Sequence, residues 1–102
     1  MSRLEQLQKL VASTPDDPLL HYVLGLEYTN LERWGDAVAA YEAALRADPR
    51  YAAAYYHKAR AEIKAGRGAV AQDTLKVGLE VAGAAGDQKT VKEMRQLLDT
   101  IS

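Results

Sequence analysis

The chain has 102 residues, and its 13 basic and 14 acidic side chains leave a formal net charge of −1, so we expect one domain and find no electrostatic case for binding nucleic acid or an anionic membrane. The sequence contains no cysteine, which excludes disulfides and thiolate metal sites. Its apolar runs are far shorter than the roughly 18 residues that indicate a membrane-spanning helix, and its N-terminal stretch lacks the apolar core of a secretory signal, so we predict a cytoplasmic protein.

The first predicted element is an amphipathic helix over residues 2–15. Ser2 and Glu5 have the spacing of a capping box, in which each side chain satisfies a free backbone amide at the helix start. The helix then carries one apolar stripe, formed by Leu4, Leu7, Leu10 and Val11. Because this stripe lies 34 residues before similar positions of a later helix, we interpret 2–15 as half of a degenerate repeat that caps the N-terminal end of the core.

Residues 18–51 predict two helices joined by a short turn. Asp17 and Pro18 are typical of the first positions of a helix, and we expect this helix to end at Asn30, a residue that tolerates the left-handed conformation. The partner helix covers 34–47. Helical spacing predicts that two sets of side chains face each other: Leu24, Gly25 and Tyr28 from the first helix, and Ala37, Tyr41, Ala44 and Leu45 from the second. Glycine inside a helix costs about 0.5–1 kcal/mol relative to alanine, so its presence here indicates a close approach of the two helices.

A second copy of this unit covers residues 52–83. Small or apolar residues recur at the positions of the helix contact, namely Ala59, Ala71, Leu75 and Gly78. Gly66 stands where the first helix of this copy should end. Lys58 and Glu62 depart from the pattern, since they replace a leucine and a tyrosine of the first copy. They are four residues apart, so we predict that they pair, on a face that is partly exposed to water as expected near the end of an array.

A last helix over residues 87–101 begins at Asp87, a residue suited to the N-cap. One apolar stripe follows, formed by Val91, Met94, Leu97, Leu98 and Ile101. This helix has no hairpin partner of its own in the chain, so we expect it to cover the second unit. The predicted fold is all-α, with six helices.

The central unit resembles a tetratricopeptide repeat (TPR), a helical hairpin of 34 residues. The residues that carry the resemblance are His21-x2-Leu24-Gly25-x2-Tyr28, then Ala37-x3-Tyr41-x2-Ala44, and finally Pro49. Only His21 departs, because the family prefers tryptophan there. The resemblance implies one α-solenoid of antiparallel hairpins over residues 1–102. Its parts would be a cap helix (2–15), two full repeats (18–51 and 52–83) and a C-terminal capping helix (87–101).

Residues suited to catalysis or metal binding are scarce. No glycine-rich phosphate loop follows a strand, and the two histidines, His21 and His57, are far apart in the sequence. We interpret His21 as a half-buried replacement for tryptophan and His57 as a rim residue. Trp34, the only tryptophan, lies in the hairpin turn, where we favour packing over the turn to contact with a partner. The sequence therefore predicts no enzyme activity, no cofactor and no metal.

A second face of the first helix in each unit carries the candidate binding residues. It is formed by Leu19, Tyr22, Leu26 and Thr29 in one unit and by Ala53, Tyr56, Arg60 and Ile63 in the next. In TPR proteins this face lines the concave groove, so the resemblance implies a groove of tyrosine, leucine and one arginine. The family's clamp for chaperone C-termini needs lysine and asparagine, but Tyr22, Leu26 and His57 occupy those positions, so we do not expect a clamp.

The function predicted from these residues is that of a protein–protein interaction module, an adaptor or scaffold that binds an extended or helical segment of a partner in the groove. The alternative is a self-assembling structural unit, a homo-oligomer formed through the groove or the C-terminal helix with no external peptide. Internal packing by the capping helices is the simplest competing explanation for the apolar stripe.

Overall fold

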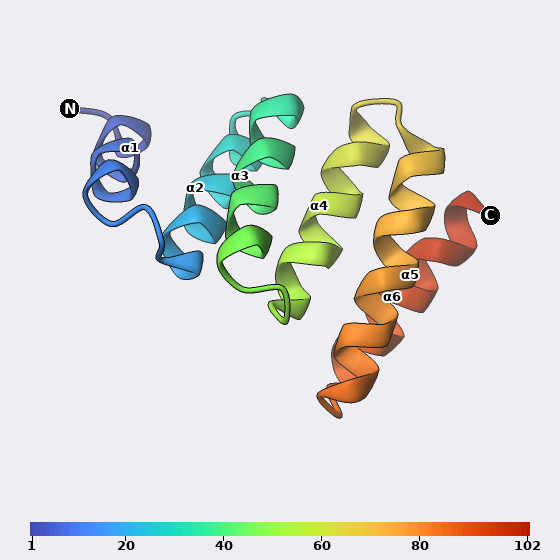
Figure 1. The fold of residues 1–102 in the computed structure, drawn as a ribbon. Helices are drawn as coiled ribbons and strands as arrows, with labels where there is room; N and C mark the ends of the chain where they lie inside the picture. The colour runs from blue at the N-terminus through green and yellow to red at the C-terminus, as the bar shows by residue number, and fades with distance from the viewer.

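The computed structural model describes all residues from 1 to 102. It contains six α-helices and no strand, in the order α1 (Arg3–Ser13), α2 (Pro18–Asn30), α3 (Trp34–Ala47), α4 (Ala52–Lys64), α5 (Gly68–Ala84) and α6 (Gln88–Ile101). The predicted all-α fold with six helices is confirmed. Figure 1 shows the helices side by side in chain order, so that the two termini lie at opposite ends of a body measuring 40 × 28 × 18 Å.

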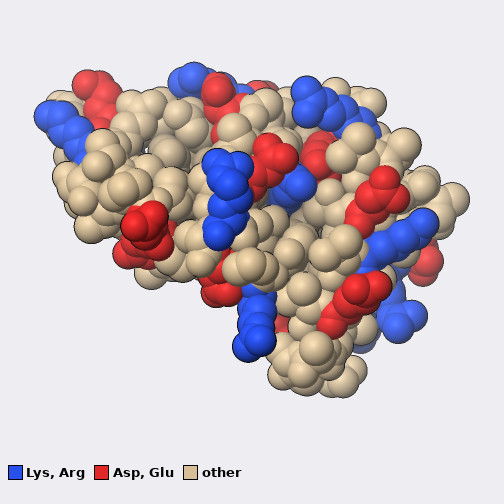
Figure 2. Space-filling view, in the orientation of Figure 1, with Lys and Arg blue, Asp and Glu red and all other residues tan.

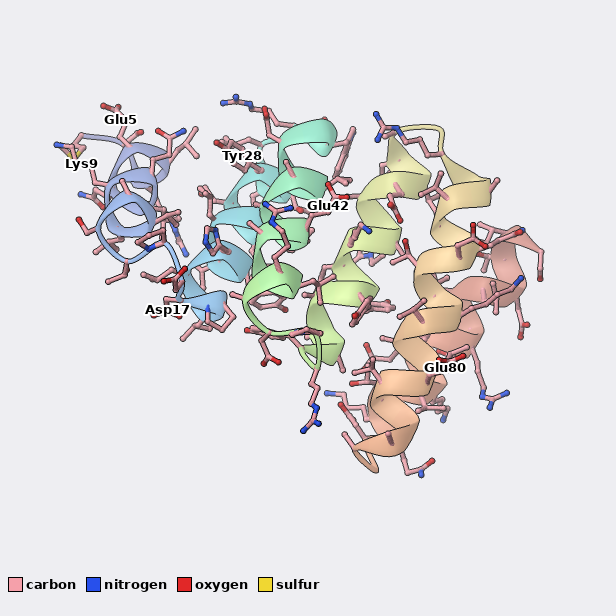
Figure 3. All side chains as sticks on the ribbon, viewed as in Figure 1. Glu5, Lys9, Asp17, Tyr28, Glu42 and Glu80 are labelled. Atoms are coloured by element: carbon pink, nitrogen blue, oxygen red, sulfur yellow. The ribbon has the colours of Figure 1, made fainter.

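Polar side chains cap the N-terminal ends of three helices. The Ser2 hydroxyl accepts a hydrogen bond from the Glu5 amide at 3.1 Å, and the Glu5 carboxylate accepts one from the Ser2 amide at 3.4 Å, which is the predicted capping box. Asp17 accepts from the amides of the next turn at the start of α2, where Figure 3 labels it. Asp87 caps α6 in the same way. These caps stabilise the helix ends by satisfying amides that have no partner within the helix.

The turns that end α2 and α4 share one hydrogen-bonding pattern. At Gly66 the backbone is left-handed, with φ of 81°, and the Arg67 amide donates to the Glu62 carbonyl at 2.8 Å. This is the predicted helix-ending glycine, in a Schellman motif. In the turn after α2 the left-handed residue is Glu32, with φ of 57°, whereas Asn30 stays helical. The predicted helix end at Asn30 is confirmed, although the left-handed residue of the turn lies two positions later, at Glu32.

In each hairpin the two helices come closest where a glycine of one helix contacts a large side chain of the other. A Cβ atom added to Gly25 would lie 2.7 Å from Cδ1 of the Tyr41 ring, and one added to Gly78 would lie 2.8 Å from Cβ of Tyr55. Both distances are shorter than any carbon–carbon contact, so only glycine fits at these crossings. The close approach predicted from the sequence is therefore confirmed, and the Tyr41 side chain is completely buried.

The two terminal helices cover opposite ends of the hairpin array to different extents. The α6 helix packs on both α5 and α4, and its Met94 is completely buried in a cluster with Leu75. The α1 helix packs on α2 and buries only Leu7. Leu10, which belongs to the apolar stripe predicted for this helix, is 50% exposed, because α1 has only one neighbouring helix to cover its apolar side.

A buried polar network links the two repeats at the positions where the sequence predicted a wet face. Glu62 is only 2% exposed, and its Oε1 accepts a hydrogen bond of 2.7 Å from the Thr74 hydroxyl of α5. The Lys58 Nζ lies 3.8 Å from Glu62 Oε2 and 3.8 Å from Glu42 Oε2. Figure 3 shows Glu42 extending from α3 toward α4. The predicted Lys58–Glu62 pair is confirmed, but the predicted partial exposure to water was wrong for Glu62, because Thr74 and α5 cover it.

The helices form two layers of different spacing. In the layer of α2, α4 and α6, each helix contacts the next, whereas α1, α3 and α5 make no contacts with one another. The array therefore curves toward the α2–α4–α6 layer, which gives it a concave face on that side. In Figure 1, α2 and α6 lie behind α3 and α5. The face of α3 and α5, seen in Figure 2, mixes acidic and basic side chains without a large area of one sign.

Candidate partner-binding groove

The seven candidate residues predicted from the sequence lie on α2 and α4, the two adjacent helices of the inner layer. They are Leu19, Tyr22, Leu26, Thr29, Tyr56, Arg60 and Ile63. Leu19 is 56% exposed and Arg60 is also exposed, while the other five are half-buried. We call this surface the α2–α4 groove. Its side chains combine a partly accessible apolar floor with an exposed leucine and an exposed cation.

The floor of the groove is an aromatic cluster centred on Tyr22. The ring centroid of Tyr22 lies 4.9 Å from that of Tyr51 and 5.6 Å from that of His57. Tyr41, from the hairpin contact, lies 6.0 Å from both the Tyr22 ring and the His57 ring. Tyr56 meets His57 edge-on at 5.3 Å. Rings at these distances and tilts attract each other, so the cluster holds its side chains in fixed positions.

Four of the candidate residues also contribute to the core, since Tyr56 and Ile63 pack against the buried cluster of Leu75 and Met94. Tyr22 and Leu26 pack against a buried cluster that contains Val38 and Ala61, and the Thr29 hydroxyl lies 2.9 Å from the Tyr41 hydroxyl. The expectation that the groove face is separate from the faces that close the hairpins is therefore wrong for these positions. Each of these half-buried side chains contacts the core on one side and faces the groove on the other.

Burial favours the neutral form of the ionisable groups of the floor. It raises the pKa of Tyr22 and of Tyr41 above the usual range. It lowers the pKa of His57, and the nearby Arg60 guanidinium lowers it further, while Glu93 acts in the opposite direction. Desolvation penalises the charged form of each group. The floor therefore presents neutral rings and hydroxyl groups, and the positive charge of the groove comes from its rim.

A small hollow opens beside this cluster, where three helices meet. It has a volume of about 50 Å³ and is lined by Thr29, Trp34, His57, Arg60, Ala61 and Lys64. Lys64 is not among the residues predicted from the sequence, whereas Trp34 was expected in the turn and His57 at a rim. The spacing of Arg60 and Lys64, four residues apart on one side of α4, is the signal that could have identified Lys64.

The two cations at this hollow have no acidic partner. The ion pairs of the structure involve Arg3, Arg33 and Lys58, and neither Arg60 nor Lys64 takes part in one. The guanidinium carbon of Arg60 lies 5.8 Å from the centroid of the Tyr56 ring, a distance at which an aromatic face attracts a cation. Arg60 is therefore held against the groove with its hydrogen-bond donors unpaired by any carboxylate.

A larger hollow of about 540 Å³ lies away from the groove, between the loop after α3 and the end of α5. Its lining residues are Arg50, Glu80, Val81, Ala84 and Ala85, and Figure 3 labels Glu80 on the outer side of α5. It contains no aromatic side chain, and its two charges are of opposite sign. Volume alone favours this site, but partner contacts are enriched in tyrosine, tryptophan and arginine, which favours the α2–α4 groove.

No group of three or more histidine, aspartate or glutamate side chains is close enough together to hold a metal ion. His21, which stands where the family prefers tryptophan, places its Nε2 atom 2.6 Å from the Pro15 carbonyl. This hydrogen bond ties the loop before α2 to the helix, so it gives His21 a structural role. No helix combines the length and the apolar composition that are needed to cross a membrane.

The fold and the sequence agree on the family. A tetratricopeptide repeat family model matches residues 31–93, which is more than half of the chain. The chain is also 35% identical over 98 residues to the TPR repeat-containing protein PA0015 of Pseudomonas aeruginosa, with 93% of this chain and 90% of that protein covered. The protein therefore belongs to the tetratricopeptide repeat family, as the resemblance of its central unit indicated.

Solved structures show the same arrangement of helices. Protein BPP2914 from Bordetella parapertussis is 31% identical, and the two structures match with a TM-score of 0.85 over 99% of this chain and 88% of that one. The TPR2B domain of yeast Sti1, solved in complex with pHsp70, is 22% identical with a TM-score of 0.88 over 93% of this chain and 76% of that one. The Yersinia enterocolitica type III secretion translocator chaperone SycD is 17% identical with a TM-score of 0.90 over 96% and 68%. At these last two identities the likeness concerns the fold alone.

Proposed function

We propose that this protein is a protein-interaction module that binds an extended or helical segment of a partner protein in the α2–α4 groove. The observation that carries the proposal is the gathering of half-exposed tyrosines and an unpaired arginine on the concave side of the array. Repeat solenoids bind partners on this surface because stacked helices present a continuous row of side chains there. No catalytic step is part of the proposal.

Each side chain of the groove has a distinct role in it. Tyr22 and Tyr56 supply rigid apolar area and a hydroxyl group, at low entropic cost because the aromatic cluster already orders them. Leu19 and Leu26 extend the apolar contact, and Arg60 pairs with an acidic or carbonyl group of the partner. Thr29 and Ile63 complete the wall of the groove.

The family comparison supports binding of a protein partner, although not through the same residues. The Sti1 domain, which has the same fold, was solved in complex with pHsp70, and SycD is described as a translocator chaperone. In this chain Tyr22, Leu26 and His57 stand where a carboxylate clamp would need lysine and asparagine. They cannot form the charge-assisted contacts of that clamp, so we propose that the groove binds an internal segment of the partner.

Self-assembly through the groove or through α6 is the second candidate. The observation that favours it is the exposure of Leu19 at the groove, together with that of Leu10 on α1, since exposed leucines are covered readily by another copy. Light scattering over a concentration series separates the two functions. A dimer that persists at micromolar concentration and dissociates on Leu19→Glu substitution favours self-assembly.

A random-peptide selection tests the proposal directly. The groove variant combines Leu19→Glu with Arg60→Glu, which changes two exposed side chains and leaves the core intact. The control variant combines Lys9→Glu with Arg95→Glu, two exposed residues outside the groove. We expect the wild type and the control to enrich the same internal peptide sequences, while the groove variant binds them at least about tenfold more weakly, or about 1.4 kcal/mol.

Circular dichroism of all three proteins ensures that the comparison is between folded molecules. The proposal is wrong if the wild type enriches no peptide, or if the groove variant binds the enriched peptides as tightly as the control does.

A further inference from the structure

We infer that the hollow between Trp34, His57, Arg60 and Lys64 receives the carboxylate of an aspartate or glutamate side chain from within the partner segment. This inference rests on the proposed function, because it names the chemistry of the residue that the groove selects. It goes beyond that function by replacing a general contact to Arg60 with a defined subsite for one acidic side chain.

The size of the hollow fits the end of an acidic side chain. A single water molecule needs at least about 10–15 Å³ of such space, so a hollow of about 50 Å³ accepts a group of a few heavy atoms. A carboxylate with its adjoining methylene is such a group, whereas an aromatic ring is too large. The indole of Trp34 and the Ala61 side chain offer apolar contact to the methylene.

The charge of the hollow is complementary to a carboxylate. Arg60 and Lys64 lie four residues apart on α4, so their like charges repel each other across one helical turn. Neither forms an ion pair within the chain. A carboxylate bound between them relieves the repulsion and provides the acceptor that their donors lack. Charge-assisted hydrogen bonds of this kind are about twice as strong as those between neutral groups.

The neighbouring groups provide one further donor and no competing acid within ion-pair distance. The Thr29 hydroxyl lines the hollow, but it donates its proton to the Gly25 carbonyl and so is not a donor to the ligand. Burial lowers the pKa of His57, which favours the neutral imidazole, and this form can donate one hydrogen bond. Glu93 of α6 is the acidic group whose charge reaches His57, but it pairs with neither Arg60 nor Lys64.

The test uses two amidated dodecapeptide libraries that differ at one central position, fixed as glutamate in one and as glutamine in the other. Amidation removes the terminal carboxylate, so binding reports on internal residues. Trp34 is the only tryptophan of the chain and lines the hollow, so its fluorescence reports occupancy of the subsite. We expect the wild type to bind the glutamate library about tenfold more tightly than the glutamine library, with a change in Trp34 emission.

The decisive variant is Lys64→Gln, which removes one charge from an exposed side chain in the last turn of α4. We expect it to lose most of the preference for glutamate and to keep its affinity for the glutamine library. The matched control is Lys76→Gln on α5, an exposed lysine that does not line the hollow, and it should behave as the wild type does.

The outcomes separate this inference from the proposed function. Equal binding of the two libraries by the wild type, or an equal preference in the Lys64→Gln and Lys76→Gln variants, overturns the acidic subsite and leaves groove binding intact. If neither library binds, the proposed function fails and the subsite fails with it. A preference that disappears in Lys64→Gln but not in Lys76→Gln supports the inference.

Discussion

At the scale of single residues, the close packing of the hairpins depends on glycine, which has no side chain. Gly25 has no Cβ atom, and this lets the Tyr41 ring lie directly against the backbone of α2. The ring is then buried completely, while its hydroxyl finds a partner in Thr29. A large aromatic side chain in the core contributes more to stability than the conformational freedom of one glycine costs.

Substitution of Gly25 by alanine should therefore destabilise the protein, although alanine is the better helix former. The added methyl group would overlap the Tyr41 ring, and overpacking of this kind costs about 1–3 kcal/mol. The matched control is Gly35→Ala in α3, where an added Cβ meets no atom within 4 Å. Because Gly35 is the second residue of α3, that variant should gain at most about 0.5–1 kcal/mol from helix propensity. Urea unfolding measures both, and a gain in both variants would show that Tyr41 can move aside at no cost.

At the scale of elements, the helix boundaries depend more on the backbone conformation of the turns than on capping side chains. The α3, α4 and α5 helices have no side-chain cap at their N-terminal ends. Instead, left-handed residues end α2, α4 and α5, at Glu32, Gly66 and Gly86. Glycine occupies two of these three positions because it has no steric penalty there, and Glu32 is the exception.

Replacement of Glu32 by glycine should therefore stabilise the protein. The left-handed conformation costs a residue with a Cβ atom about 1–2 kcal/mol, and glycine removes this cost. The greater conformational freedom of glycine in the unfolded chain offsets part of the resulting gain in stability. We expect a net increase of about 0.5–1 kcal/mol in the free energy of unfolding, measured by urea titration. Glu32→Ala removes the same charge but keeps the strain, so it should show no such increase. Equal stabilisation by both substitutions would assign the effect to charge.

At the scale of the whole molecule, the array is closed unequally at its two ends. The α6 helix packs on two helices and buries Met94, whereas α1 packs on one helix and buries Leu7 alone. Buried apolar area is the main stabilising contribution to such contacts. The N-terminal end of the array is therefore the less stable end.

Hydrogen exchange should detect this difference along the chain. Amides of α1 should exchange through local opening well before those of α4 and α5, while those of α6 should show intermediate to strong protection. Native-state exchange followed by nuclear magnetic resonance or mass spectrometry measures every helix in one sample, so α6 serves as the internal control. Protection of α1 equal to that of α5 would show that the whole array opens as one unit.

The sequence by itself determined the helices of this protein and their pairing. Apolar and small residues recur at helical spacing, Ser2, Asp17 and Asp87 provide local caps, and Gly25 marks the crossing of two helices. These signals act between residues close in the sequence, or between one residue and the helix that follows it. They were therefore sufficient for the six helices and for the family.

Only the tertiary structure decided what is buried and which polar groups meet. Glu62 is buried because Thr74, twelve residues later, reaches it from α5, and Leu10 is exposed because α1 packs against α2 alone. The hollow beside Trp34 and Lys64 exists because three helices bring those side chains together. Burial and electrostatic partnership depend on distances across the fold, and the helical periodicity of a sequence contains no information about those distances.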